Sequence, residues 1–330
     1  MSTPLPLGLA PYISPTTLVN APTGIDWSTI GDPTADPSPA ENMAEIWDMC
    51  GRATSRCDGY INQVLRATAD VELVHGPDYR VTSGPASGGS ALTPYWGVSR
   101  AANTRVILSR WPVLAVTGVQ TCPNNLWPRQ WTQLPSGYFE PEVPPIGIYG
   151  SIAPGGSAEG GQAILIGGGY VNWSLGRNGW AIQVFYVNGY PHCSLSSAVA
   201  AGVSSLPVND CTGWAIKNYY DTYTGATGRV VDSGQQEAVH VTAASATAGP
   251  GNLTLSSPLN YPHQAGTLVT TMPASVEQAC ILFCTAEALT RGATSTTIHS
   301  VGGHSQSSDQ SSESLIAEGE LLLHAYKRSI

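Results

Sequence analysis

The spacing of hydrophobic positions divides the chain into regions of different period. Between residues 40 and 65 the apolar positions recur alternately three and four residues apart, which is the pattern of an amphipathic helix. Pro39 stands where helices often begin, and Glu41 and Glu45 would lie near the positive end of the helix dipole. The sequence therefore predicts one long helix over residues 40–65. Its apolar face is Met43, Ile46, Trp47, Cys50, Ala53, Cys57, Tyr60, Ile61 and Val64.

After residue 69 the pattern changes to period two, in short apolar runs divided by turns that contain Gly, Pro or Asn. The segment 104–121 consists of two such runs, and Pro112 between them indicates a strand edge or a bend. Shorter runs near 230, 240 and 254 have the rhythm of a small barrel or sandwich. The strands predicted are 71–76, 79–83, 104–121, 163–167, 180–189, 206–210, 230–231, 238–241 and 253–255.

Helical spacing returns near the C-terminus in two segments. The first runs from Pro273 to Leu289, with Ser275 as a candidate N-cap. A polar, low-complexity segment, 292–312, follows it and has almost nothing to bury. The last helix begins near Ser312, its candidate cap. The positions on its predicted face are Leu315, Ile316, Gly319, Leu322, Leu323 and Tyr326, and Lys327 and Arg328 fall in its last turn.

The first forty residues contain eight prolines and show no periodicity. This pattern predicts an extended, non-helical arm. Because the arm carries Leu18, Val19, Ile25 and Trp27, we expect it to lie against the body of the protein or against a neighbour.

These patterns predict an α+β chain. Helical segments near both ends would flank a large β-rich middle of sandwich or barrel type. The expected parts are an extended Pro-rich arm (1–39), helical parts at both ends (40–70 and 273–330), a β-rich region (71–202) and a second small β unit (203–272).

Charge narrows the possible partners. Only 11% of residues are charged, against about 25% in average soluble domains, and the net charge is −9. A basic stripe that could grip nucleic acid is missing, whereas an acidic wall would let DNA pass without holding it. The N-terminus has no secretion signal and the sequence has no apolar run of membrane-spanning length, so we expect a protein made in the cytoplasm that does not bind membranes.

Candidate chemistry is sparse. The seven cysteines include no CxxC pair. Cys50 and Cys57 share one helical face, as do Cys280 and Cys284, so a four-thiolate zinc site is conceivable. Small buried hydrophobic side chains are the favoured interpretation. We expect no metal, no cofactor and no catalytic residue.

Two patterns leave an enzymatic or sugar-binding alternative open. Glu140 and Glu142 lie beside Tyr138 and Trp131, a set that could serve glycoside hydrolysis or carbohydrate binding. The Gly-rich string 155–160 contains a serine but has no helix after it, so a loop is favoured over a nucleophile elbow.

The order of segments resembles a known family. The stretch CGRATSRCDGYINQVLRATADVELVHGPDYRVT, the run RVILSRWPVLAVTGVQ, the series VNDCTGW, GQQEAVHVTAA and GNLTLSSPLNYPHQAGT, and the closing helices with their polar joint are similar to the head-to-tail adaptor (connector) proteins of long-tailed bacteriophages. That resemblance implies a small helical core, formed by the N- and C-terminal helices, that carries the β-rich region as a large insertion. It also implies a structural virion protein, assembled in the host cytoplasm and located in the phage neck, where a ring joins the portal to the tail and lets DNA pass. The helical core with its C-terminal docking segment would then be residues 40–70 and 273–330, and the segment 292–312 would order on docking.

The resemblance also implies the partners. They are the portal protein, neighbouring copies of the chain in a twelve-fold ring, and the next connector or tail-terminator protein. The C-terminal part would dock onto the portal, through Ser312, Leu315, Ile316, Leu322, Leu323, Tyr326, Lys327 and Arg328. The alternatives are another virion structural protein, such as a tail terminator or minor capsid protein, and a carbohydrate-binding module or glycosidase.

Overall fold

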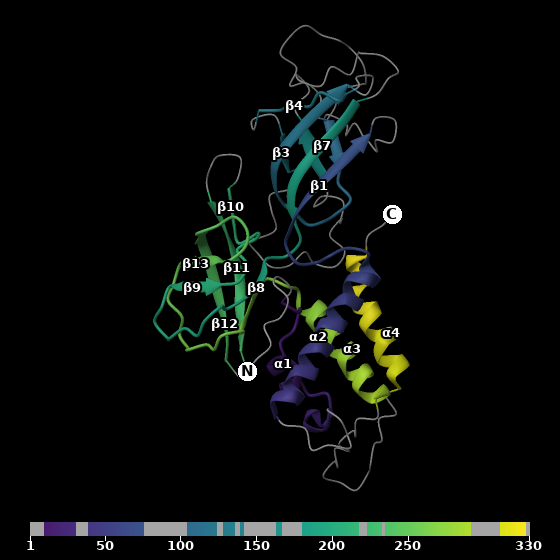
Figure 1. Ribbon diagram of the computed structural model, residues 1–330, viewed down its shortest axis with the longest axis vertical. Helices are drawn as coiled ribbons and strands as arrows, with labels where there is room; N and C mark the ends of the chain where they lie inside the picture. The colour runs from purple at the N-terminus through teal and green to yellow at the C-terminus, as the bar shows by residue number, and fades with distance from the viewer. Residues whose placement is uncertain are drawn as a thin grey trace, which may run out of the picture.

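A computed structural model describes residues 10–30, 39–75, 104–123, 128–135, 139–141, 163–166, 180–217, 223–232, 235–291 and 311–327. Figure 1 shows three parts: a bundle of helices, a sheet above it, and a second sheet beside it. The predicted α+β class is confirmed, because helices and antiparallel sheets are both present.

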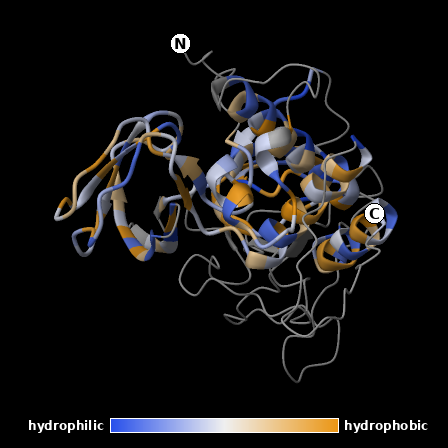
Figure 2. Cartoon of the chain, turned by 90° about the horizontal axis from the view of Figure 1, so that it is seen from below, coloured by the Kyte–Doolittle hydropathy of each residue, from blue (hydrophilic) through white to orange (hydrophobic). Residues whose placement is uncertain are grey.

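The helical bundle brings together segments from both ends of the chain. The helix predicted over 40–65 is α2 (Pro39–Ile61), and the one predicted over 273–289 is α3 (Ala274–Thr290). The last helix, α4 (Ser312–Leu323), continues into a short 3-10 turn, η6 (His324–Tyr326). Their apolar faces share one buried cluster, which we call the helical core, so the predicted core of N- and C-terminal helices is confirmed. Figure 2 shows this bundle and the second sheet as neighbouring bodies.

The N-terminal arm is part of the same core. It contains a short helix, α1 (Pro15–Asn20), and a 3-10 turn, η1 (Trp27–Thr29), so the prediction of a wholly non-helical arm is wrong. Ser14 caps α1 by accepting a hydrogen bond from the backbone N–H of Thr17, and Pro15 takes the first helical position, where proline is tolerated. Tyr12 and Leu18 are buried in the helical core, so the arm packs against its own chain.

The upper sheet has the strand order β1-β7-β3-β4 and is antiparallel throughout. The bend predicted at Pro112 lies directly before β3, and the peptide bond between Trp111 and Pro112 is cis. Its strands are β1 (Thr68–His75), β3 (Val113–Pro123), β4 (Thr132–Gln133) and β7 (Trp180–Asn188). A three-stranded sheet of order β2-β6-β5 consists of β2 (Thr104–Ile107), β5 (Phe139–Pro141) and β6 (Ala163–Ile166).

The seven-stranded sheet beside the helical bundle, which we call the small β unit, has the order β8-β14-β11-β12-β13-β9, and β10 pairs with β11. Its buried cluster comes entirely from residues 193–269. Because β8 pairs with β14, the unit begins before the predicted boundary at residue 203. Its strands are β8 (His192–Ser194), β9 (Ser205–Val208), β10 (Ala215–Lys217), β11 (Tyr223–Asp232), β12 (Gln235–Ala244), β13 (Gly251–Leu255) and β14 (Leu268–Thr270).

Candidate functional site

The C-terminal helix, predicted to dock onto a partner, is packed closely against α3. A Cβ atom added at Gly319 would lie 2.5 Å from Cε1 of Phe283, so α4 can approach α3 this closely only because residue 319 is glycine. Leu315 is buried in a small cluster with Leu282 and Ala286 of α3. The helix is therefore a member of the helical core and does not stand apart from it.

The eight residues predicted to dock fall into distinct places. Leu315, Leu323 and Tyr326 are buried in the chain's own interior, whereas Lys327 is exposed. Ser312, Ile316 and Leu322 are partly exposed, and Arg328 lies outside the described residues.

The ends of α4 differ from the predicted ones. Ser311, and not Ser312, is the N-cap, because its hydroxyl accepts a hydrogen bond of 3.1 Å from the backbone N–H of Ser314. Likewise α3 begins after Pro273, which makes no side-chain cap hydrogen bond, so Ser275 is not its cap. Lys327 follows the closing 3-10 turn, and its ammonium lies 4.8 Å from the centre of the Tyr60 ring. A cation over a ring face is a favourable contact, which replaces the predicted dipole interaction.

The outer face of α4 is the part of this helix that a partner can reach. Leu321 is 75% exposed, the most of any large apolar residue described. Glu313, Ala317 and Glu318 are also exposed. One protruding leucine among acidic and small side chains is a suitable contact for a complementary protein surface.

The turn after α4 forms a joint between the helical core and the upper sheet. Tyr326 stacks on Trp111, with ring centroids 6.0 Å apart and planes 11° from parallel. Gln63 donates to the Tyr326 carbonyl at 3.4 Å and accepts from the Trp111 backbone N–H at 3.3 Å. The Tyr326 hydroxyl also lies 2.8 Å from the Ser275 hydroxyl. No pattern in the sequence indicates that these four residues meet.

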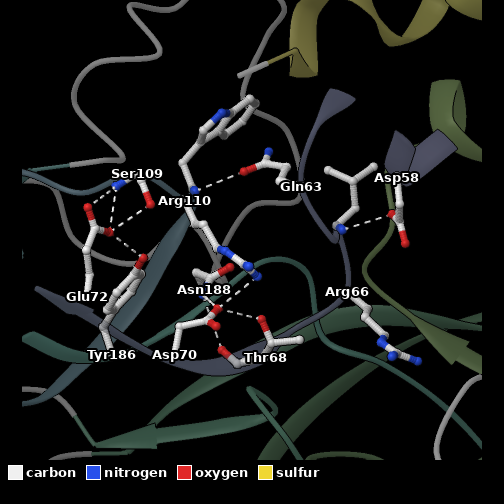
Figure 3. Close-up of polar contacts among 12 residues, drawn as sticks. Asp58, Gln63, Arg66, Thr68, Asp70, Glu72, Ser109, Arg110, Tyr186 and Asn188 are labelled. Atoms are coloured by element: carbon white, nitrogen blue, oxygen red, sulfur yellow. Dashed lines mark hydrogen bonds and ion pairs between the residues drawn. The ribbon is translucent and has the colours of Figure 1, made fainter. Parts of the chain in front are cut away.

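Two carboxylates fix the base of the upper sheet (Figure 3). Glu72 accepts hydrogen bonds from the backbone N–H of Ser109 at 2.8 Å and from the hydroxyl of Tyr186 at 2.9 Å. Asp70 accepts from the guanidinium of Arg110 at 3.3 Å and from Asn188. Burial, together with the nearby charge of Glu72, raises the pKa of Tyr186, so this hydroxyl stays a donor. Since their acceptor capacity is used internally, these acidic groups hold the loop before β3 in place.

A second joint fastens the small β unit to the helical core. His192 of β8 is buried, and its ring nitrogens lie 2.9 Å from the Pro11 carbonyl and 2.8 Å from the Thr270 hydroxyl. Burial lowers the pKa of His192 to about 4, so the ring is neutral near pH 7. In the same joint Arg229 of β11 forms a 2.6 Å ion pair with Glu277 of α3. Burial raises the pKa of Glu277 to about 7, although Arg229 opposes this shift.

An exposed ion-pair network ties α2 to the end of α3. Glu45 contacts both Arg52 and Arg291, and Glu287 contacts the same two guanidinium groups at 2.9 Å each. Partial burial of Glu45 opposes its ionisation, but the hydrogen bonds from Arg291 and Arg52 outweigh that effect and lower the pKa of Glu45.

A cleft of about 330 Å³ lies between the arm and α2, with Trp47, Arg52 and Arg66 among its lining residues. On its wall the Tyr12 hydroxyl donates to Asp58 at 2.5 Å and accepts from the backbone N–H of Leu65 at 2.9 Å. Burial raises the pKa of the Asp58 carboxyl. The hydrogen bond between Tyr12 and Asp58 joins the N-terminal arm to the end of α2, so this carboxylate has a structural role.

The four cysteines considered as metal ligands occupy interior positions. Cys50, Cys57, Cys280 and Cys284 are all buried in the helical core, as the preferred interpretation predicted. Within the described part of the chain, no group of three or more His, Cys, Asp or Glu is arranged to hold a metal ion. Of the set for glycoside chemistry, Tyr138 and Glu142 lie outside the described residues, as does the string 155–160.

None of the helices in the described ranges has the length and hydrophobicity that a bilayer span requires. Comparisons with protein-family models, with curated proteins and with solved structures found no match to this chain.

Proposed function

We propose that this protein is a structural component of a tailed-phage virion that forms a ring in the neck and joins the portal to the tail. Copies of the chain would surround a channel through which DNA passes without specific binding. The observation that carries the proposal is the closure of one helical core by the N-terminal arm, α2, α3 and α4, with both β parts attached to it.

The construction of the core suits an assembly subunit. The rigid helical core positions the upper sheet and the small β unit as two separate projections. Each projection offers a surface to a neighbouring copy or to the next ring. The joint at Tyr326 fixes the direction of the upper sheet relative to the helical core, and the joint at His192 does the same for the small β unit. Such fixed geometry is what a closed ring requires, because every copy must repeat the same contacts.

The charge of the chain supports the same role. A net charge of −9 with two lysines gives a surface that repels phosphates. Exposed apolar side chains are present on different parts, with Leu321 on α4, Val71 and Leu73 on β1, and Tyr261 near the small β unit. Contacts at several faces are expected of a subunit that touches a portal, its own copies and a tail-side partner.

The burial of α4 decides how portal docking should be tested. Deleting the chain from residue 292 onward would remove Leu315, Leu323 and Tyr326 from the interior and damage the fold along with any interface. A single exposed residue is the better target. We propose Leu321→Glu, assayed by binding to portal-bearing heads assembled in cells that lack this protein.

The matched control is Tyr261→Glu, which places the same charge at an exposed position of the small β unit. Both variants should keep the wild-type circular dichroism and melting temperature. We expect Leu321→Glu to weaken head binding about tenfold or more, as loss of a central apolar contact does, and Tyr261→Glu to leave it unchanged. Equal binding of both variants would contradict docking through α4. A wild-type protein that ignores portal-bearing heads but binds a glycan would contradict the neck function itself.

A further inference from the structure

The strongest unassigned feature is a group of four cysteines between α2 and α3. Cys50 and Cys57 come from α2, and Cys280 and Cys284 from α3, and all four are buried. The sulfur atoms of Cys57 and Cys280 lie 3.3 Å apart. The neighbouring Cys50 thiol, together with burial, raises the pKa of Cys284 well above its ordinary value. Because no metal-holding arrangement exists among the described residues, the close approach of two thiols calls for another chemical interpretation.

We propose that Cys57 and Cys280 are a disulfide-forming site that staples α2 to α3 in the presence of a small-molecule disulfide oxidant such as oxidised glutathione. A disulfide needs its sulfur atoms about 2.05 Å apart. The two sulfur atoms, 3.3 Å apart, are already in contact and face each other across the two helices. This inference does not rest on the proposed neck function.

The reaction proceeds by two exchanges. The thiolate of one cysteine attacks the sulfur–sulfur bond of the oxidant, forms a mixed disulfide and releases one small thiol. The second cysteine then attacks the protein sulfur of the mixed disulfide and releases the second small thiol. Two protein thiols are oxidised, one oxidant molecule is reduced to two thiols, and the two protons leave with those thiols.

Burial makes this site slow to react in the folded protein. Burial and the adjoining Cys57 thiol raise the pKa of Cys280 well above its ordinary value, so little thiolate is present near neutral pH. The site therefore stays reduced unless the core opens transiently or the chain folds in an oxidising medium.

The position of the pair gives the bond its consequence. Cys57 and Cys280 are 223 positions apart, and every strand of the upper sheet and the small β unit lies between them in the sequence. One bond would therefore close the chain at the base of the whole β-rich insertion. Closing so long a loop restricts the unfolded chain more than closing a short one.

The test uses the full-length protein with oxidised glutathione, at urea concentrations raised stepwise until the first of the four core cysteines reacts. Free thiols are then alkylated, and non-reducing peptide mass spectrometry identifies the first product. We expect a peptide that joins Cys57 to Cys280, and a melting temperature higher by about 5 °C that falls back on reduction. A first product of any other kind, or a linked protein with an unchanged melting temperature, overturns the proposal.

Two single variants separate this pair from its neighbours. Cys50→Ala removes a thiol of the same cluster but leaves the proposed pair, so the cross-link and the shift in melting temperature should persist. Cys57→Ala removes one member of the pair and should abolish both. Should either variant fail to fold, the wild-type peptide map still decides the question.

Discussion

The helical core and the small β unit are built in opposite ways from the same chain. The cluster of the small β unit comes from one continuous stretch, residues 193–269. The helical core takes buried residues from Tyr12 through to Tyr326, including Trp111 and Tyr190 from the β-rich middle. One region is therefore held by contacts within a single continuous stretch of sequence, and the other by contacts between segments from both ends and the middle of the chain.

That difference predicts how the two regions respond to damage. A contiguous unit can lose stability without affecting the rest, because its cluster draws on no distant segment. A core assembled from the chain's two ends loses the contacts of several segments together. The contacts of His192 and Glu277 connect the small β unit to the helical core, so a change there can affect the stability of both regions.

The largest expected effect comes from Phe283→Ala in the helical core. The ring is buried and supports both the close approach of Gly319 and the guanidinium of Arg56, 4.9 Å from its centre. We expect the free energy of unfolding to fall by about 4 kcal/mol. Urea unfolding measures the loss, and hydrogen exchange should place it in α2, α3 and α4. Equal loss of protection in β12 and β13 would contradict the separation of the two regions.

The matching change in the small β unit is Leu253→Ala. Leu253 of β13 is buried and faces Leu206 of β9 in the sheet register. Truncation should lower the stability of this unit by about 3 kcal/mol. Hydrogen exchange should show faster exchange in β9, β12 and β13 while α2 and α3 keep their protection. Loss of protection in the helices would show that the small β unit depends on the helical core more closely than its contiguous cluster indicates.

The joint between the regions should respond to acid through His192. Its folded pKa of about 4 lies below the ordinary value of 6.5, so the unfolded chain binds more protons between these values. Stability is therefore fully present above pH 6.5 and falls by up to about 3 kcal/mol as the pH drops towards 4. His192→Gln should remove this slope in urea unfolding measured from pH 4 to 7.

Glu277 in the same joint should give the opposite slope. Its folded pKa of about 7 lies above the ordinary 4.5, so stability is lost as the pH rises from 4.5 to 7. In the wild-type protein the two slopes partly cancel. Glu277→Gln should therefore steepen the acid sensitivity that His192 causes, and an unchanged profile in this variant would argue against the burial of the carboxyl.

The smallest effect is expected at the exposed ion pairs. Glu45→Gln removes the charge that links Arg52 and Arg291, but these side chains are 33% to 46% exposed and are screened by salt. We expect a loss below about 1 kcal/mol that disappears in 1 M salt. A larger loss that persists at high salt would show that the network holds α2 to α3 as firmly as the buried contacts do.

Much of the fold could be predicted from local pattern. The helices over 39–61 and 274–290, and strands such as β3, β7 and β12, follow the spacing of apolar positions that their burial requires. The helix at residues 15–20 was missed although its signal is present, since Ser14 before Pro15 is an N-cap followed by a proline at the first helical position. The density of prolines around this pair concealed it.

The candidate site was predictable only in part. Helical spacing of apolar residues located α4 and marked Leu315 and Leu323 as members of one face. Spacing alone does not say whether such a face meets a partner or the chain's own core. The partner was α3, because Gly319 permits a close approach that depends on Phe283, a residue of another helix. The exposure of Leu321 follows from this packing, because it lies on the side of α4 that faces away from α3.

The sequence by itself determined the periods, and with them the α+β class, the helical ends and the β-rich middle. Tertiary structure decided that the proline-rich arm closes the helical core, that Tyr326 meets Trp111, and that the thiols of Cys57 and Cys280 lie side by side. The physical reason is range. Periodicity records which side of an element is buried, whereas the identity of the buried partner depends on which distant segments pack together with the least strain and the fewest unpaired polar groups.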